Sequence, residues 1–328
     1  MSLKYVSALT AAASAATYNY AQNGADWGSV DAQCNGANQS PIALYSKDHK
    51  DFDYEVLYKG KSDIGTFDYT NQKNMKVAWL GHTSQATVAT GTNTFESKIA
   101  EEVFGADTKF NAAQFHFHAA SEHTIDGKRF DLEMHTVHLP TIKKNEFFGA
   151  VVGIIFDVED YNADLWWAER RIIDTFFESL QWDNTADDSV TVDLVAYGDL
   201  MEMINHNQRW VYKGSLTTPP CTTNVYWNVL STVYPIQQKH LDLFKAQLNR
   251  GEDGALDERG NYRIIQPING QDVRYVDGWA EGDDEGEAAR AEVRRLNAAA
   301  LGLIVATFVG VMAVLVIVCI RTRQTKTS

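Results

Sequence analysis

The sequence predicts a mainly β domain with peripheral helices (α+β), followed by a single transmembrane helix. Three observations predict this class. Short β-type runs are separated by clusters of Gly, Asn and Asp, which is typical of a mostly antiparallel sheet. Two stretches carry apolar residues at helical spacing. The segment 298–320 has 23 residues and no charge. We therefore expect one domain over residues 17–277 and a membrane helix after it.

The strand candidates are four to eight residues long in most cases and carry β-branched or aromatic side chains. They are 53–58, 76–78, 86–89, 114–118, 132–138, 151–158 and 225–229. The segment 163–180 repeats Ile173, Phe176 and Phe177 at helical spacing, and 238–249 repeats Leu241, Phe244 and Leu248. These apolar stripes are typical of helices that pack on a core.

The two ends of the chain predict passage through the secretory pathway. Residues 1–16 have one cation followed by small and apolar residues, as in a signal peptide, although an Ala-rich leader would look similar. Residues 298–320 are long enough to cross a bilayer. An acidic and basic linker, 278–297, precedes this span, and an eight-residue cytosolic tail, 321–328, follows it. We expect a single-pass type I membrane protein whose domain is extracellular or lumenal. The cell membrane is the expected location.

Composition excludes one class of partner. The net charge of -14 argues against nucleic-acid binding, because phosphate backbones are bound through clusters of Lys and Arg. The hydrophobic content of 45% is enough for a large core.

The stretch 114–138 (QFHFHAASEHTIDGKRFDLEMHTVH) contains five of the nine histidines. Side chains alternate between the faces of a strand, so His116 and His118 share one face. Antiparallel pairing with the next strand would bring His135 beside them. Three neutral imidazoles without a fourth protein ligand are typical of a catalytic zinc site that keeps a position for water. The alternative is an ordinary cross-strand histidine pair.

Neighbouring polar residues favour the metal site. Ligating histidines usually donate their second ring N–H to a carboxylate or amide partner. Gln114 lies two residues before His116, and Glu133 lies two residues before His135. We expect these two to be outer-shell partners, and we expect His123 and His138, on core-type positions, to be structural.

Several motifs, in order over most of the domain, resemble those of the α-class carbonic anhydrases, and of their secreted, membrane-anchored members in particular. They are FHFH, SEHT and EMH, together with Gln39-Ser40-Pro41-Ile42, Ser215-Leu216-Thr217-Thr218-Pro219-Pro220, Asn261-Tyr262-Arg263 and Gln266-Pro267. The resemblance implies a twisted sheet of about ten strands with a conical cleft. It also implies Zn²⁺ and the reversible hydration of CO2 to bicarbonate and a proton by zinc-bound hydroxide.

The resemblance implies further roles. Thr217 would accept a hydrogen bond from the hydroxide and donate one to Glu122, and His82 would carry protons away. Residues matching the substrate-binding positions are Thr217, Thr218, Val137, Val151, Leu216, Val225 and Trp227. Cys34 and Cys221 would form a disulfide bond, as in related secreted enzymes.

Some residues depart from the family pattern. Ser29 stands where a tyrosine is usual, and Leu80 and Gln85 stand where asparagines often line the cleft. These departures change polar side chains that would hold an ordered chain of water between the zinc and His82. They do not change a residue expected to bind zinc. The competing hypothesis is a catalytically silent binding or adhesion ectodomain on the same fold.

Overall fold

The structure is a computed structural model, and its described residues all lie within the first of two units of the chain, Met1–Trp279. They are residues 18–58, 65–89, 91, 93–105, 109–141, 147–162, 167–250 and 256–278. The predicted signal peptide, transmembrane span and tail lie outside them, as does the predicted linker beyond Gly278. Among the described residues, no helix is long and apolar enough to cross a membrane.

Most described elements are strands. The strands are β1 (Ala43–Leu44), β2 (Glu55–Leu57), β3 (Thr66–Asp68), β4 (Gln72–Trp79), β5 (Ser84–Thr87), β6 (Thr94–Glu96), β7 (Lys109–His118), β8 (Thr124–Ile125), β9 (Lys128–Arg129), β10 (Leu132–Pro140), β11 (Gly149–Asp157), β12 (Ser189–Val195), β13 (Gln208–Ser215), β14 (Thr223–Pro235) and β15 (Arg274–Asp277). The α-helices are α2 (Lys98–Phe104), α3 (Trp167–Ser179), α4 (Tyr197–Met203), α5 (Gln238–Leu248) and α6 (Leu256–Arg259), and the 3-10 helices are η2 (Trp27–Ser29), η3 (Ala32–Asn35) and η4 (Glu159–Asn162).

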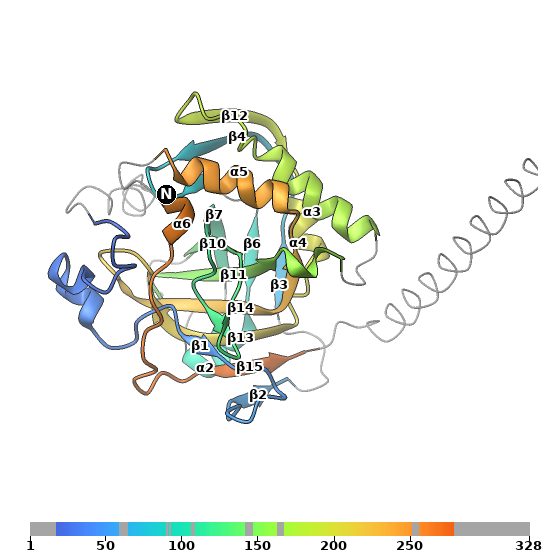
Figure 1. Cartoon of the computed structure of the whole chain (residues 1–328). Coiled ribbons are helices and arrows are strands. Elements are labelled where there is room, and N and C mark those ends of the chain that lie inside the picture. Colours follow the sequence, from blue (N-terminus) through green and yellow to red (C-terminus); the bar gives the residue numbers. More distant parts are fainter. Residues whose placement is uncertain are drawn as a thin grey trace, which may run out of the picture. The chain divides into compact units, whose positions relative to one another are not determined.

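The main sheet is twisted and mixed (Figure 1). Its path runs β12-β4-β5-β7-β10-β11-β14-β13-β15-β2, and β6, which pairs with β7, joins β3 to it. These two short strands bring the total in the described residues to 12, against the ten or so expected. Along the main path, β11–β14 and β15–β2 are parallel, so the expectation of a mostly antiparallel sheet is confirmed with two exceptions.

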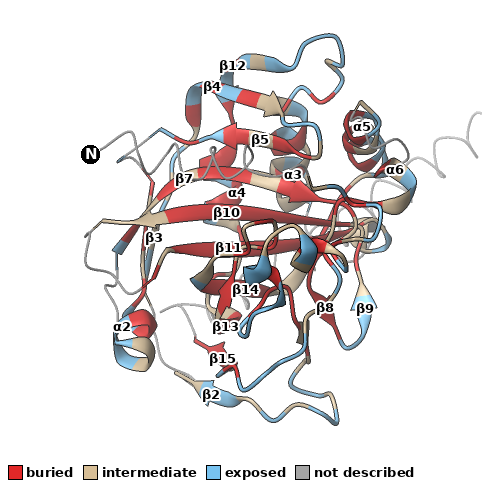
Figure 2. Cartoon of the chain, turned by 90° about the vertical axis from the view of Figure 1, so that its left-hand side faces the viewer, coloured by how far each residue is buried: buried red, intermediate tan, exposed pale blue. Residues whose placement is uncertain are grey.

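The centre of the sheet is buried on both faces, whereas the edge strands are partly exposed (Figure 2). Every residue of β11 is buried, and so is every residue of β10 except the last two. Strand β12 at the edge is mostly exposed or partly exposed, with only Val192 and Val195 buried. The candidate site lies on β7 and β10, in the largely buried centre of the sheet.

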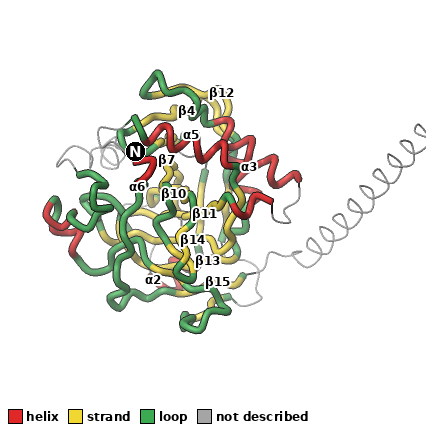
Figure 3. The backbone as a smooth tube through the Cα atoms, in the orientation of Figure 1, coloured by secondary structure: helices red, strands yellow, loops and turns green. Residues whose placement is uncertain are grey.

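Alternation along β7 divides its side chains between two environments, as predicted. Phe115 and Phe117 pack against the helices, with ring centroids 5.7 Å from Phe176 of α3 and 5.9 Å from Phe244 of α5 respectively. The apolar stripes expected on 163–180 and 238–249 therefore pack on the core, although 163–166 lie outside the described residues. Long loops, drawn in green, surround the strands on the other side (Figure 3).

Candidate metal centre

Three histidines from two neighbouring strands converge on one point. His116 and His118 lie on β7 and His135 lies on β10, directly opposite His116 in the antiparallel register. The ring centroids are 5.0 Å apart for His116 and His118, 5.3 Å for His116 and His135, and 4.6 Å for His118 and His135. One nitrogen of each ring lies within 4.8 Å of the others. The predicted juxtaposition of the three imidazoles is confirmed.

The second ring nitrogen of each histidine is hydrogen-bonded, which fixes the ring orientation. His116 Nδ1 lies 2.9 Å from Gln114 Oε1, and His135 Nε2 lies 2.7 Å from Glu133 Oε1. His118 Nδ1 lies 2.7 Å from the backbone oxygen of Asn261. Because each acceptor requires an N–H, the lone pairs left over are those of His116 Nε2, His118 Nε2 and His135 Nδ1. These three nitrogens face one another.

The donor set fits a zinc ion. His118 Nε2 is buried and has no hydrogen-bond partner among the described residues, a state that costs free energy unless another group binds it. Burial lowers the pKa of His118, and burial together with the neighbouring imidazoles lowers the pKa of His116 well below its usual range. Both imidazoles are therefore neutral near pH 7, as metal ligands must be. Three ring nitrogens as ligands would leave one position of a tetrahedral site open.

Glu133 is completely buried and accepts four hydrogen bonds. The backbone N–H groups of Glu122 and His123 donate to Oε2, each at 2.8 Å, and ring nitrogens of His123 and His135 lie 2.7 Å from Oε1. Burial alone would raise its pKa, yet His123 and His135 hold the pKa well below its usual range. His123, Glu133 and His135 also meet the geometry of a metal cluster, but their atoms already bond to one another. The carboxylate therefore orients His135.

The predicted relay carboxylate, Glu122, is buried beside the three histidines. Its Oε1 accepts a hydrogen bond of 2.8 Å from the backbone N–H of Arg263. Its Oε2 lies 3.8 Å from His135 Nδ1 and is buried without a hydrogen-bond partner among the described residues. Thr217 is 6% exposed and lines the neighbouring cleft. The hydrogen bond between Thr217 and Glu122 stays a prediction.

The three histidines lie in a cleft of about 240 Å³ with one apolar side. Four of the five predicted wall residues line it, namely Val137, Val151, Leu216 and Trp227, and Thr218 lines it as well. Val225 is buried in the same apolar cluster and is not among the lining residues. Tyr18, Leu80, His82 and Gln85 also line the cleft. A small uncharged molecule would meet apolar side chains next to the imidazoles.

Asn261 is a site residue that the sequence analysis quoted only as part of a motif. Its backbone oxygen orients His118, and its side chain donates to the backbone oxygens of His82 at 2.8 Å and Phe117 at 2.9 Å. Its Oδ1 accepts a hydrogen bond of 2.7 Å from the N–H of Ala119. Asn261 thus holds the His82 loop against the strand that carries the ligands.

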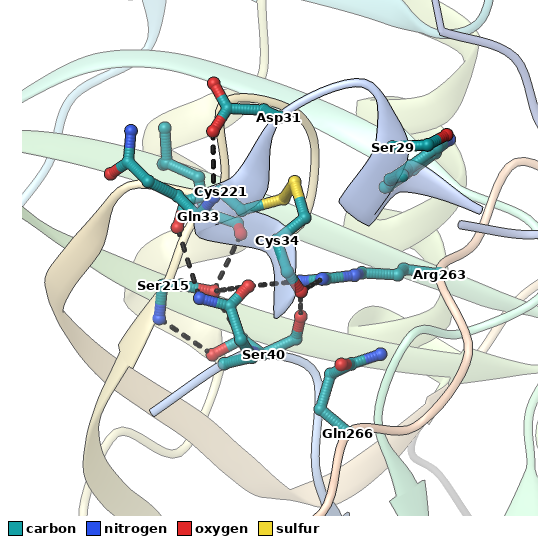
Figure 4. The surroundings of a disulfide bond; sticks show 12 residues. Ser29, Asp31, Gln33, Cys34, Ser40, Ser215, Cys221, Arg263 and Gln266 are labelled. Atoms are coloured by element: carbon teal, nitrogen blue, oxygen red, sulfur yellow. Dashed lines mark hydrogen bonds between the residues drawn. A yellow bond between two sulfur atoms is a disulfide. The ribbon is translucent and has the colours of Figure 1, made fainter. Parts of the chain in front are cut away.

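The loop that carries Thr217 and Thr218 is tied to the N-terminal segment (Figure 4). The predicted disulfide between Cys34 and Cys221 is confirmed, with an S–S distance of 2.06 Å. Ser40 and Ser215 exchange backbone-to-hydroxyl hydrogen bonds of 2.9 Å and 3.1 Å. The guanidinium of Arg263 donates to the Cys34 oxygen, to Gln39 Oε1 and to the Ser40 oxygen, each at 2.8 Å. The loop is therefore anchored on both sides of Thr217.

The fold and the three converging imidazoles define a mainly β protein with a three-histidine cluster that could hold a metal ion. The family model for eukaryotic-type carbonic anhydrases matches residues 22–277, and the chain belongs to this family. Family membership places it among the lyases, and the reaction of the family is the hydration of CO2.

Relatives and solved structures agree with this assignment. The chain is 30% identical to carbonic anhydrase 6 of Canis lupus familiaris over 266 residues, covering 73% of both chains. It is 31% identical to a carbonic anhydrase of Klebsiella pneumoniae, covering 75% of this chain and 85% of that one. The solved structure of an α carbonic anhydrase from Aspergillus oryzae superposes with a TM-score of 0.58 at 26% identity, over 78% of this chain and 96% of that chain.

Proposed function

We propose that this chain catalyses the reversible hydration of CO2 to bicarbonate and a proton, with Zn²⁺ held by His116, His118 and His135. The observation that carries the proposal is the convergence of three imidazole nitrogens beside an apolar cleft wall. A zinc ion there would act as a Lewis acid and make a hydroxide nucleophile available near neutral pH. The side chains of the cleft would bind CO2, orient the nucleophile and carry the proton away.

The cleft residues would orient the reactants. Val137, Val151, Leu216 and Trp227 offer CO2 an apolar surface on which its carbon faces the ligand side of the cleft. The Thr217 hydroxyl would donate to the open Oε2 of Glu122, which accepts no other hydrogen bond among the described residues. Its oxygen then accepts a hydrogen bond from the nucleophile and directs a lone pair toward the carbon. Thr218 would hold the bicarbonate that forms.

The proton that is released must leave the cleft. An imidazole with an ordinary pKa near 6.5 is a suitable carrier at neutral pH. His82 lies on the cleft and is partly exposed, so it reaches both the interior and the solvent. We assign it the role of proton carrier.

The proposed location is outside the cytosol. A disulfide between Cys34 and Cys221 supports an oxidising compartment. The membrane anchor at 298–320 rests on its length and apolarity alone. Protease treatment of intact cells would degrade a surface domain and leave an internal one whole.

The test is stopped-flow CO2 hydration by the purified full-length chain, combined with measurement of bound zinc. We expect about one zinc per chain and hydration well above the buffer rate. A chelator should abolish the activity and added Zn²⁺ should restore it. Stoichiometric zinc without hydration would contradict the proposal and favour the silent binding ectodomain.

A further inference from the structure

Tyr212 on β13, a residue to which the sequence analysis gave no role, has its hydroxyl between two polar side chains from distant parts of the chain. The oxygen lies 2.8 Å from His123 Nε2 and 2.9 Å from Ser40 Oγ. All three side chains are completely buried. Burial raises the pKa of Tyr212 well above its usual range, so the phenol keeps its proton at neutral pH. A hydroxyl both donates and accepts, and this one therefore joins the two neighbours.

On one side of Tyr212, the contacts lead to the three converging histidines. His123 Nδ1 lies 2.7 Å from Glu133 Oε1, and the same carboxylate oxygen lies 2.7 Å from His135 Nε2. Both ring nitrogens of His123 are therefore engaged, one by the carboxylate and the other by the phenol. The imidazole of His123 thus connects Tyr212 to the carboxylate that orients His135.

On the other side, the contacts lead to the loop between β13 and β14, residues 216–222, which carries Thr217. Ser40 Oγ accepts the backbone N–H of Ser215 at 3.1 Å, and Ser215 Oγ accepts the backbone N–H of Ser40 at 2.9 Å (Figure 4). Ser215 is the last residue of β13 and stands two positions before Thr217. The position of Ser40 therefore fixes where the loop begins.

Close packing holds these side chains in one arrangement. The ring of Tyr212 lies parallel to that of Trp227, with centroids 6.1 Å apart. Trp227 Nε1 in turn donates a hydrogen bond of 2.9 Å to the backbone oxygen of Ser215. Gly214 leaves the space that this arrangement needs, because a Cβ there would clash with Ser40 Oγ and with the Tyr212 ring. The phenol is therefore held by its surroundings as well as by its hydrogen bonds.

We infer that Tyr212 is a positioning residue that couples the orientation of His135 to the position of Thr217. The inference rests on the proposed function, in which His135 and Thr217 face the same nucleophile. The coupling runs through the Tyr212 network, which consists of Glu133, His123, Tyr212, Ser40 and Ser215, each within 3.1 Å of the next. A buried polar network whose members are bonded to one another is rigid, so a displacement at one end is felt at the other.

The proposed reaction needs such a connection. Thr217 must lie within hydrogen-bond reach of a nucleophile held at the three imidazoles, and an error of about 1 Å in such a placement is costly. His135 stands on β10, whereas Thr217 follows β13, and β11 and β14 lie between these two strands in the sheet. Strand pairing alone therefore does not place the loop against the imidazole. The Tyr212 network joins the two directly.

The first experiment uses Zn²⁺ alone and does not measure turnover. Zinc should fix the imidazole of His135, and in the unmodified full-length chain it should slow hydrogen exchange of the Ser215 N–H by about tenfold. In Tyr212→Phe, which keeps the ring and its packing, zinc should change this rate by less than about twofold. The same loss is expected in Ser40→Ala, so the test stands if one variant fails to fold. NMR of the ¹⁵N-labelled chain measures the rates, and equal slowing in all three proteins, or none in the zinc-bound unmodified chain, would overturn the inference.

The second experiment measures turnover. Tyr212→Phe should lower kcat/KM for CO2 hydration by about tenfold, and imidazole buffer should not restore it, because the nucleophile is misplaced and proton transfer is unaffected. Zinc affinity should fall by less than about threefold, since Glu133 still bonds to His135 directly. The double variant with Ser40→Ala should be no slower than the slower single variant, because both changes break one network. Additive losses, or a loss of zinc that accounts for the fall in kcat/KM, would overturn the inference.

The matched control is Tyr226→Phe. Tyr226 is also completely buried, and its hydroxyl lies 3.0 Å from another serine hydroxyl, that of Ser97, with neither residue lining the cleft. This variant should leave kcat/KM and the effect of zinc on the Ser215 N–H unchanged. A similar loss in Tyr226→Phe and Tyr212→Phe would overturn the inference, because any lost buried hydroxyl bond would then have the same effect. An unmodified chain that binds zinc but does not hydrate CO2 would overturn the proposed function, and the exchange rates would still test the coupling.

Discussion

The chain buries two groups of histidines that differ in what their rings face. His118 and His135, each 1% exposed, face the cleft together with His116. His138 and His206 are buried in the core among aromatic rings: His206 stacks on Phe67 with centroids 3.9 Å apart, and His138 Nε2 lies 2.8 Å from the Tyr69 hydroxyl.

Burial alone does not distinguish the two groups. It lowers the pKa of His138 to about 4 and that of His206 to about 3, and it also lowers the pKa of His118. His206 even shares with His118 a buried ring nitrogen without a hydrogen-bond partner among the described residues. What distinguishes the proposed zinc ligands is convergence, because three nitrogens from His116, His118 and His135 lie within 4.8 Å of one another.

The largest expected difference between the two groups is in zinc affinity after one imidazole ring is removed from each. His118→Ala leaves two of the three donor nitrogens. Zinc affinity should fall by more than about 10²-fold, since loss of an outer-shell partner alone costs 10–100-fold, and hydration should fall to the buffer rate. His206→Ala should keep zinc and lower the free energy of unfolding by roughly 2–4 kcal/mol through lost packing.

Both variants are compared by zinc content after dialysis and by urea unfolding at pH 7. Equal zinc loss in the two variants would show that burial, and not convergence, sets the metal site. Zinc retained by His118→Ala would remove His118 from the ligand set.

The next effect concerns the outer partners of the two groups. Glu133→Gln keeps the shape of the side chain but removes the charge that faces His123 and His135. Zinc affinity should fall by about 10–100-fold. Tyr69→Phe removes the bond to His138 and should leave zinc affinity unchanged. Competition with a chromogenic chelator measures both, and a similar loss in both variants would contradict the separation of the two groups.

The convergence of the three histidines could be predicted because it follows from a local rule. Alternation along two strands places His116, His118 and His135 on one face once the strands pair antiparallel, with His135 opposite His116. The partners Gln114 and Glu133 were also predictable, since each lies two residues from its histidine and so shares its face.

Other contacts could not be predicted because they join distant segments through the backbone. His118 bonds to the carbonyl of Asn261, and Glu122 accepts the N–H of Arg263. Every residue has a backbone carbonyl, so the order of side chains in the sequence does not indicate which backbone group will form such a bond. The bond between Tyr18 and His82 spans 64 residues and has no local signal.

The sequence also did not predict which strands pair parallel and which pair antiparallel. Strand β11 is buried throughout and β14 is buried over residues 225–230, and such buried segments fit parallel and antiparallel neighbours alike. A parallel pair is possible here because a long connection lies between the two strands, but the length alone does not decide the direction. The two pairs of parallel strands are therefore a result of the tertiary fold.

The smallest effect is a dependence of stability on pH that belongs to the core group. The folded pKa of His138 is about 4, below the ordinary value of 6.5, so the unfolded chain takes up a proton first as the pH falls. The stability contributed by the neutral imidazole is complete above about pH 6.5 and is lost between pH 6.5 and 4. From pH 7 to pH 5 the loss should be about 2 kcal/mol.

His138→Gln keeps an acceptor for the Tyr69 hydroxyl and cannot titrate, so the fall in stability between pH 7 and pH 5 should be about 2 kcal/mol smaller than in the unmodified chain. Urea unfolding of the metal-free chain at both pH values measures this difference without a contribution from zinc release. His49→Gln is the control, because His49 is partly exposed and stacks on Tyr45 at the surface. An equal fall in the unmodified chain and in His138→Gln would contradict this prediction. It would show that His138 is already protonated in the folded state at pH 5 and does not cause the loss of stability.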